Sequence, residues 1–263
     1  MSTQVKPARS LDLDSLADVL LNNPNIELRL KAARSLVKLG DQGAVEILVT
    51  ASNDGDPIFR AKLVKVISRL EHPASVGIMV NAINDTDCYV RKTAVESVAI
   101  VDHPDILKAL LGCLDDEEVN VRESVVIALE KSRQADLVVE MLTGALADRH
   151  WNVRRESVEI MAKIGGDRAV EPLRRMLKDE DPEVRMTALI GLANLVGAEV
   201  VSNAIDSLSD PDLSVQLEGF DIVGRFGTSS IIPILSQIAS HEDCSEIVRQ
   251  AALSSERQIR KRA

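Results

Sequence analysis

Aromatic residues are nearly absent from this sequence of 263 residues, which contains one Trp, one Tyr and three Phe. Pockets for large ligands are mostly lined by apolar and aromatic side chains, so this composition argues against a generous aromatic pocket. The core must instead be built from Leu, Val, Ile and Ala, because the large aromatic side chains that often dominate a core are missing. Such small aliphatic side chains suit closely packed helices.

Cysteine is also scarce. Cys88, Cys113 and Cys244 are odd in number, lie far apart and form no CxxC pair. The pattern therefore predicts neither a disulfide framework nor a zinc site, and it agrees with a reducing compartment. We expect Cys113 in the core, because it lies on an apolar helix stripe.

No apolar run of the roughly eighteen residues that a membrane span needs is apparent, and residues 1–10 lack the apolar core of a secretory signal. We therefore expect no membrane span and a cytoplasmic protein. The net charge of −10 and the pI near 5.0 oppose attraction to phosphate backbones, so nucleic acid is not an expected partner. Apolar residues make up 45% and charged residues 27%, which is typical of a folded, soluble chain.

An internal repeat is the strongest feature that the sequence does contain. An arginine that follows an apolar residue recurs along the chain, and we call its place the anchor position. The anchor positions are 29, 60, 91, 122, 154, 185, 216 and 249, so the steps are 31, 31, 31, 32, 31, 31 and 33 residues. The anchor residue is Arg everywhere except at Gln216. Six positions before each anchor stands an Asn or Asp: Asn23, Asp54, Asp85, Asp116, Asp148, Asp179, Asp210 and Asp243.

Each repeat contains two helical patterns. Apolar or small residues recur three, four and seven positions after the anchor, as in Ala188, Leu189 and Leu192. Together with the apolar residue before the anchor, they form one stripe of a helix with 3.6 residues per turn. A shorter stripe precedes each anchor, as in Leu107, Leu110, Leu111 and Leu114. Each unit is therefore a pair of helices.

The turn between the two helices explains the recurring Asn or Asp. Asp56-Pro57 and Asp181-Pro182 place an N-cap acceptor before a proline at the first helical position. The Asp two residues earlier can bind backbone N–H groups of the turn. Stacking would bring each anchor arginine towards an acidic turn residue, so we expect a ladder of ion pairs that serves stability.

Glycines and His-Pro pairs mark the breaks between repeats. Gly40, Gly165, Gly197 and Gly227 stand where helix ends need a left-handed residue, and His72-Pro73 and His103-Pro104 stand where proline stops a helix. The expected repeats are 11–40, 42–71, 73–102, 104–133, 135–165, 167–196, 198–227 and 229–260.

A unit of two short helices cannot bury its apolar face alone, so neighbouring units stack into a continuous core. The sequence therefore predicts an all-α fold, a right-handed α-solenoid of about eight helix pairs with a 31-residue period. We expect a flexible tail at 1–10, a single array at 11–263 and a monomer.

The turn Asp followed by Val-Arg at the start of the second helix resembles the HEAT-repeat superfamily, over nearly the whole chain. The short period is most similar to the HEAT-like repeats of the phycobilisome lyase type. This resemblance is specific for fold and not for function. Tetratricopeptide and ankyrin repeats fit less well, since their signatures are absent and their periods differ.

The resemblance implies a protein-binding scaffold, adaptor or assembly chaperone without cofactor. It leaves open a bilin lyase subunit or bilin chaperone acting on phycobiliproteins, against which the scarcity of aromatics counts. Deoxyhypusine hydroxylases are also HEAT-like, but they bind iron through repeated His-Glu pairs. This chain has one such pair, His241-Glu242, so the required ligand set is missing.

No catalytic pattern emerges from the remaining residues. There is no Gly-x-Ser-x-Gly elbow, no Gly-rich phosphate loop and no HExxH helix. We therefore expect no catalytic, cofactor-binding or metal-binding residue.

In HEAT solenoids the second helix of each pair typically lines the concave side, and the positions one, two and five beyond the anchor are expected outside the core. These positions are basic in the first repeats, mixed in the middle and apolar to acidic later. Three large apolar groups in adjacent repeats favour partner binding over a merely solvated face. The expected partner-binding residues are Lys31, Arg34, Lys62, Lys65, Lys92, Arg155, Glu156, Glu159, Met186, Ile190 and Leu217. A rim bearing Tyr89, His150 and Trp151 is the alternative surface.

Overall fold

The computed structural model describes residues 8–70, 72–98 and 102–263, which form α-helices, two short 3-10 helices and no strand. The protein is an α-solenoid, as the repeat predicted. By its internal contacts the chain divides after Arg133 into two compact units, and each is described by itself. Helix α1 begins at Ala8, within the expected tail at 1–10, and residues 1–7 lie outside the described residues.

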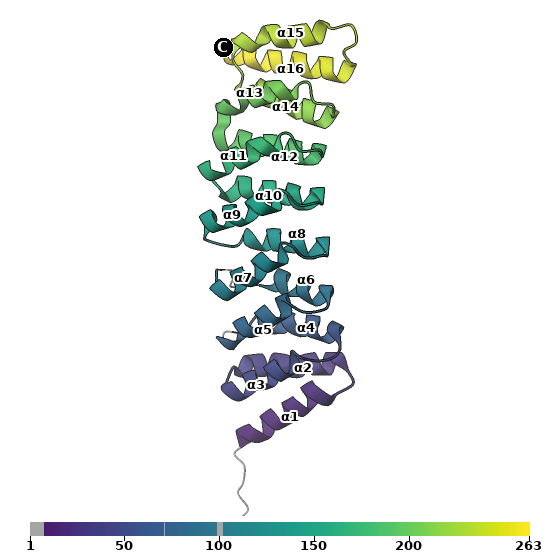
Figure 1. Ribbon diagram of the computed structural model, residues 1–263, viewed down its shortest axis with the longest axis vertical. Coiled ribbons are helices and arrows are strands. Elements are labelled where there is room, and N and C mark those ends of the chain that lie inside the picture. The colour runs from purple at the N-terminus through teal and green to yellow at the C-terminus, as the bar shows by residue number, and fades with distance from the viewer. Residues whose placement is uncertain (1–7, 71, 99–101) are drawn as a thin grey trace, which may run out of the picture. The chain divides into compact units, whose positions relative to one another are not determined.

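The described residues of unit 1 form four helix pairs (Figure 1). They are α1 (Ala8–Asn22) with α2 (Ile26–Leu39), α3 (Gln42–Ala51) with α4 (Pro57–Ile67), α5 (Ala74–Ile83) with α6 (Cys88–Ser97), and α7 (Pro104–Cys113) with α8 (Val119–Leu129). Second helices pack on second helices, α2 on α4, α4 on α6 and α6 on α8, while α1 packs on α3 and α5 on α7.

Unit 2 contains the other four pairs. They are α9 (Ala135–Ala145) with α10 (Trp151–Ile164), α11 (Asp167–Met176) with α12 (Pro182–Val196), α13 (Val201–Ser207) with α14 (Leu213–Phe226), and α15 (Ile232–Ser240) with α16 (Glu246–Arg262). The 3-10 helices Gly197–Val200 and Ser229–Ile231 lead into α13 and α15. Again the second helices stack, α10 on α12, α12 on α14 and α14 on α16.

Side-chain caps start the second helices where the sequence predicts. Asp56 accepts a hydrogen bond from the N–H of Ile58, and Asp181 accepts one from Glu183, each before a proline at the first position. Such caps satisfy backbone donors that the helix itself leaves unpaired. The histidines of the His-Pro pairs make similar contacts: Nδ1 of His72 accepts from Ala74, and Nδ1 of His103 accepts from Asp105. His103 is the N-cap of α7, and His72 stands one residue before Pro73, the N-cap of α5, so both histidines lie at the start of the next helix.

The glycines at the breaks have two different roles. Gly40 has φ +61° and Gly197 has φ +55°, so the expected positive φ is confirmed there. Gly165 and Gly227 have negative φ, which corrects the prediction. At both, a β-carbon would clash, lying 2.7 Å from the Met161 carbonyl oxygen in one case and 2.5 Å from that of Val223 in the other.

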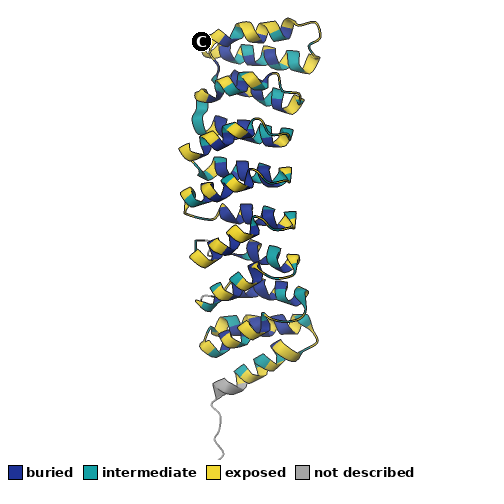
Figure 2. Ribbon diagram, in the orientation of Figure 1, coloured by how far each residue is buried: buried dark blue, intermediate teal, exposed yellow. Residues whose placement is uncertain are grey.

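The core of each unit runs between the two helix layers (Figure 2). Leu36, Leu48 and Phe59 in unit 1 and Leu189, Leu192 and Phe220 in unit 2 are almost completely buried. The predicted burial of the positions three, four and seven residues after the anchor is therefore confirmed at these residues. The first repeat departs from it, because Leu28 is exposed and Leu30 takes the buried place beside it.

Residues 182–207 are long and apolar enough to cross a membrane by length and composition, which corrects the expectation of no such stretch. In the structure this stretch comprises α12, a 3-10 turn and α13. Gly197 breaks it, α12 packs against α10 and α14, and Arg185 near its start is paired with Asp210. These contacts make it part of two consecutive helix pairs of unit 2.

Candidate partner-binding surface

The anchor arginines form the predicted ladder within each unit. Five of the anchor guanidinium groups bind the Asp carboxylate 25 residues later, in the turn of the next repeat, with N to O distances of 2.5 to 2.9 Å. The pairs are Arg29–Asp54, Arg60–Asp85, Arg91–Asp116, Arg154–Asp179 and Arg185–Asp210. Four of the five are two-pronged, which is the strong form of this contact.

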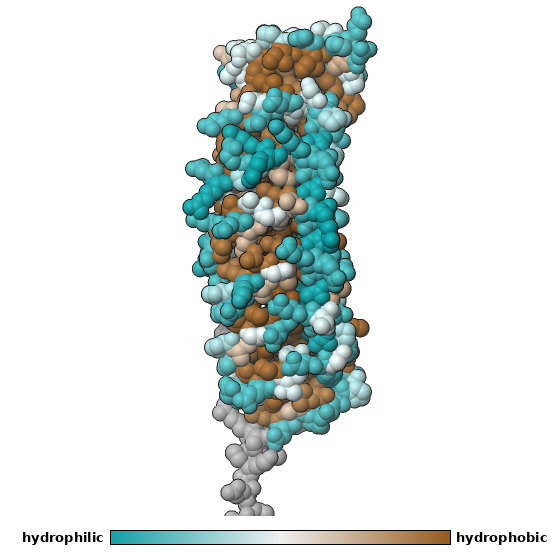
Figure 3. Space-filling view, viewed as in Figure 1, coloured by the Kyte–Doolittle hydropathy of each residue, from teal (hydrophilic) through white to brown (hydrophobic). Residues whose placement is uncertain are grey.

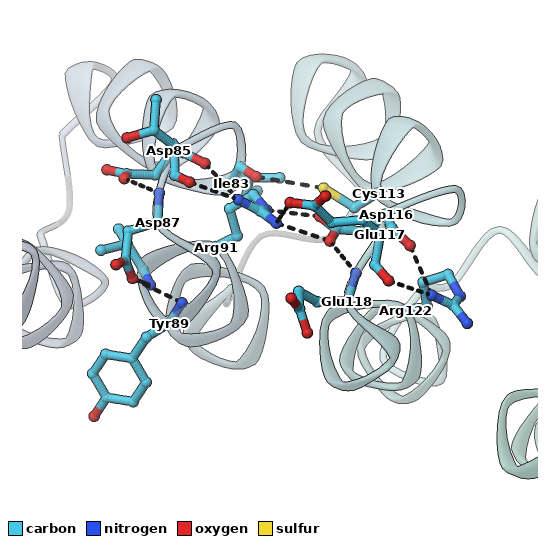
Figure 4. Close-up of polar contacts among 12 residues, drawn as sticks. Ile83, Asp85, Asp87, Tyr89, Arg91, Cys113, Asp116, Glu117, Glu118 and Arg122 are labelled. Carbon is cyan, nitrogen blue, oxygen red and sulfur yellow. Dashed lines mark hydrogen bonds and ion pairs between the residues drawn. The ribbon is translucent and has the colours of Figure 1, made fainter. Parts of the chain in front are cut away.

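Ladder residues also bind backbone groups, which the sequence predicted for the turn Asp but not for the arginine. Arg91 Nη1 donates to the backbone oxygen of Asp85 in its own turn, at 3.0 Å (Figure 4). Asp85 Oδ1 in turn accepts from the N–H of Asp87 at 2.9 Å. The guanidinium thus joins two consecutive turns, so the ladder fixes how neighbouring repeats stack.

The ladder shifts the pKa values of its members. Partial burial raises the pKa of the Asp85 carboxyl, but the hydrogen bonds from Arg60 and from the Asp87 N–H outweigh it, so the net pKa lies below the ordinary value. The same causes lower the pKa of Asp54, Asp116 and Asp210. Hydrogen bonds to Asp85 raise the pKa of Arg60. The lowered pKa values keep these four carboxylates charged at neutral pH, as ion pairing with arginine requires.

The predicted positions beyond the anchor are less uniformly outside the core than expected. Leu30 and Ala61, one position beyond, and Thr93 and Ser124, two positions beyond, are buried. Their side chains face the adjoining second helix, because second helices pack directly on one another. The position five beyond the anchor is the exposed one in most repeats, as at Arg34, Lys65, Glu96, Ile127, Ile190 and Asp221.

Unit 1 has exposed cations on two adjoining second helices, among them Lys31 and Arg34 on α2, and Lys62 and Lys65 on α4. We call these four residues the basic patch. Lys62 lies 3.5 Å from Glu27, but Lys31, Arg34 and Lys65 have no acidic partner among the described residues. The predicted Lys92 is half-buried and is paired with Glu96 on its own helix.

The predicted residues of the middle repeat are bound to one another. Arg155 contacts Glu156 and Glu159, and Glu159 also binds Lys163 at 3.0 Å. Hydrogen bonds from Lys163 lower the pKa of Glu159. These charges on α10 are satisfied inside the helix, so they offer a partner little.

The predicted apolar residues of unit 2 are partly covered. Ile190 on α12 is 37% exposed, whereas Met186 and Leu217 are half-buried. On the face shown in Figure 3, hydrophobic residues alternate with hydrophilic ones. The structure therefore leaves Ile190 as the most accessible member of the expected patch.

The remaining chemistry-bearing residues do not assemble into a site. Among the described residues, no group of three or more His, Cys, Asp or Glu could hold a metal ion. Cys113 is buried, as predicted, and burial raises its pKa to about 11, so the thiol is inert at neutral pH. On the alternative rim, Tyr89 and Trp151 are exposed and the Trp151 ring stacks on His150.

With this geometry established, comparison with known proteins identifies the family. The family model for HEAT repeats matches residues 13–83, 78–148 and 138–218. The chain belongs to the HEAT-repeat family. No curated protein matches the sequence.

Several solved structures resemble this HEAT-repeat protein over almost its whole length. YibA of E. coli is 23% identical, with 98% of this chain and 99% of that chain covered and a TM-score of 0.54. The phycocyanin lyase complex CpcE–CpcF from a Nostoc species is 19% identical, with coverage of 98% and 97% and a TM-score of 0.44. Human deoxyhypusine hydroxylase is 18% identical, with coverage of 95% and 96% and a TM-score of 0.42. Likeness at these identities concerns the fold.

Proposed function

We propose that this HEAT-repeat protein is a non-catalytic interaction module, a scaffold, adaptor or assembly chaperone, that binds a partner protein along the face of its second helices. The basic patch carries the proposal. Three of its four cations lack an acidic partner among the described residues, although the chain as a whole has a net charge of −10. A cluster of positive charges on a chain that is negative overall is suited to attracting an acidic segment of a partner.

The proposal assigns a different role in partner binding to each of the two units. Exposed charges act chiefly on the rate of association and are screened beyond about 8–10 Å at physiological salt. Apolar anchors that become buried govern how long a complex lasts. The basic patch of unit 1 therefore steers an acidic segment, and Ile190 of unit 2 holds an apolar one. The expected cytoplasmic location and monomeric state are parts of the same proposal.

Affinity purification of the tagged protein from its native cell, followed by binding kinetics with the recovered protein, tests this function. Reversing Lys62 and Lys65 to Glu should slow association by roughly tenfold and weaken its salt dependence. Reversing Lys108 and Lys178 to Glu changes the net charge equally but lies off the second helices, so association should be less affected. Equal effects of the two double variants would contradict the basic patch as the steering site.

A second variant tests the proposed apolar contact at Ile190. Ile190→Asp places a charge on an exposed position, so it should speed dissociation and leave the fold intact. Met186 is half-buried, and a charge there would also disturb the core. A partner that dissociates from Ile190→Asp at the normal rate would place the apolar contact elsewhere, with the rim at Tyr89 and Trp151 as the next surface.

A spectroscopic test separates this function from the bilin alternative. A bilin-handling protein should shift the visible absorption band of an added linear tetrapyrrole and should recover phycobiliproteins on purification. An interaction module of the kind proposed should do neither.

A further inference from the structure

Two matching rows of exposed cations lie on the adjoining second helices α2 and α4. The basic patch supplies two cations of each row, and a third exposed cation extends each row towards the end of its helix. Lys38 lies in the last turn of α2, and Arg69 lies in the turn that follows α4. Each cation of the α4 row stands 31 residues after its counterpart, and α2 packs on α4. The rows are Lys31, Arg34 and Lys38, and Lys62, Lys65 and Arg69.

The spacing within each row is that of one side of an α-helix. Both rows follow the pattern i, i+3 and i+7, so successive cations lie about one turn apart and each row is about 10 Å long. Packed helices lie about 8–10 Å apart, which sets the distance between the rows. Among the described residues, Lys62 is the one member with an acidic partner, Glu27 at 3.5 Å. The charges of the other five are therefore available to a partner.

An apolar edge adjoins the rows on the side of the turns. Ile58 precedes Lys62 by one helical turn on the same side of α4 and is 54% exposed. Tyr89 has the equivalent place on α6, which packs on α4, and is 52% exposed. Its ring points away from the ladder (Figure 4). The caps Asp56 and Asp87 accept from the N–H groups of Ile58 and Tyr89, so both side chains start from fixed places at the beginning of their helices.

An α-helix with an acidic side matches this surface. With its side chains a helix is about 10 Å across, so one helix can contact both rows at every turn. An extended chain turns alternate side chains away from the surface and would bring fewer carboxylates to the cations. Acidic residues are favoured near the start of a helix, which places that start over Lys38 and Arg69. The helix then runs antiparallel to α4, and its next turn reaches Ile58 and Tyr89.

We propose that this face of unit 1 binds an acidic α-helix of a partner protein, with Asp or Glu over the two rows and a large apolar side chain against Ile58 and Tyr89. The inference rests on the proposed function and makes it more specific, since it names the kind of segment and adds an apolar contact within unit 1. Nucleic acid matches less well, because its phosphates would also approach the caps Asp56 and Asp87 on a chain with a net charge of −10.

Fluorescence anisotropy with the full chain tests the inference on two labelled peptides of about sixteen residues, long enough to form helix. The striped peptide carries Glu on one side of the helix over three successive turns and Leu one turn later. The scrambled peptide has the same composition with Glu spread around the helix, and circular dichroism checks that both peptides are equally helical. The striped peptide should bind about tenfold more tightly, because its ion pairs form together. Equal affinities would overturn the helix while leaving attraction of an acidic segment in place.

A pair of exposed apolar positions tests the edge. Tyr89→Ala should weaken binding of the striped peptide by about fivefold, because less apolar surface is covered, and should not affect a striped peptide with Ser in place of Leu. Leu111→Ala is the matched control, since Leu111 is also 52% exposed but lies on the first helix α7. Equal effects of Tyr89→Ala and Leu111→Ala would refute the apolar contact.

A charge variant tests the ends of the rows. Lys38→Glu with Arg69→Glu should weaken the striped peptide by about tenfold or more and reduce its preference over the scrambled one. If this variant fails to fold, the Tyr89 and Leu111 comparison still decides. An RNA oligonucleotide of equal charge that binds as tightly as the striped peptide, with no loss in Tyr89→Ala, would overturn the proposal in favour of a general polyanion surface. The peptides need no recovered partner, so failure here is distinguishable from failure of the Lys62 and Lys65 experiment.

Discussion

At the scale of single residues, the ladder shows why the anchor is arginine. One guanidinium meets two demands at once: the backbone oxygen of its own turn and the carboxylate of the next turn, as Arg154 does with Asp148 and Asp179. Lysine cannot present donors in this fixed fork. The first ladder arginine adds a further contact, since the Arg29 guanidinium lies 3.5 Å from the centre of the Phe59 ring.

The Arg154→Ala substitution should therefore be costly. Both side chains of the Arg154–Asp179 pair are only 7% exposed, and removing the arginine leaves a covered carboxylate without its main partner. We expect a loss of about 2–4 kcal/mol in the free energy of unfolding, measured by urea denaturation. Arg168→Ala is the matched control, because its pair with Asp136 is 63% and 72% exposed and should contribute only about 0–1 kcal/mol. Similar losses in both variants would show that the ladder is no stronger than an ordinary surface pair.

The ladder also predicts that the folded protein becomes less stable in acid. The pKa values of Asp54, Asp85, Asp116 and Asp210 lie below the ordinary 3.8 in the folded protein, so the folded state binds fewer protons than the unfolded state in acid. Their contribution to stability is present above pH values near 3.8 and is lost as the pH falls through the lowered pKa values. The melting temperature should therefore fall between about pH 5 and pH 3. In Asp85→Asn this fall should be smaller, and an identical pH profile would contradict the linkage.

At the scale of helices, the sequence predicts where helices begin better than it predicts which helix positions are buried. The expected repeats beginning at 42, 104, 135 and 167 match the first residues of α3, α7, α9 and α11. Local side-chain caps from Asp41 and His103 fix the first two of these starts. The burial of Ala61, Thr93 and Ser124 was not predicted, since it depends on how closely neighbouring second helices approach. Their small size is the signal that could have indicated such close packing.

Helix α12 offers a direct test of the helix phase. Leu192 is completely buried, whereas Ile190, two residues earlier, is 37% exposed. Leu192→Ala should lower the free energy of unfolding by about 2–5 kcal/mol, because it opens a cavity in a packed core. Ile190→Ala should change it by about 1 kcal/mol or less, since little buried surface is lost. Thermal melts that rank the two variants in the reverse order would place the wrong face of α12 in the core.

At the scale of the whole molecule, the features that stabilise the solenoid are distinct from those proposed to bind a partner. The ladder and core recur in both units, whereas the basic patch is confined to α2 and α4 and the missing arginine to α14. Periodicity predicts what recurs, so the fold and the ladder follow from the sequence. Features that occur once depend on side-chain packing: Gln216 is visible as a departure from the pattern, but the exposure of Ile58 beside the basic patch required the structure. The partner-binding assignment therefore stays a prediction.

Such an array is held together by contacts between neighbouring repeats, so its weakest step should be visible in local opening. Within unit 2, the step to α15 and α16 lacks the arginine pair. Its turn hydrogen bonds are also longer: Asp243 N to His241 Nδ1 and Val248 N to Ser245 Oγ are both 3.3 Å, whereas Asp212 N to Asp210 Oδ1 and Ser214 N to Asp212 Oδ1 are both 2.8 Å.

Amide hydrogen exchange of the intact protein should therefore be faster at Asp243 and Val248 than at Asp212 and Ser214. We expect a difference of roughly tenfold or more in exchange rate, since a charged hydrogen-bonded pair contributes about 1.5–3 kcal/mol. The matched variant Arg185→Gln removes the preceding pair and should therefore speed exchange at Asp212 and Ser214 while leaving Asp243 and Val248 nearly unchanged. Faster exchange at all four amides alike would mean that the substitution destabilises the whole unit, and equal rates in the unaltered protein would show that the missing arginine does not weaken this step.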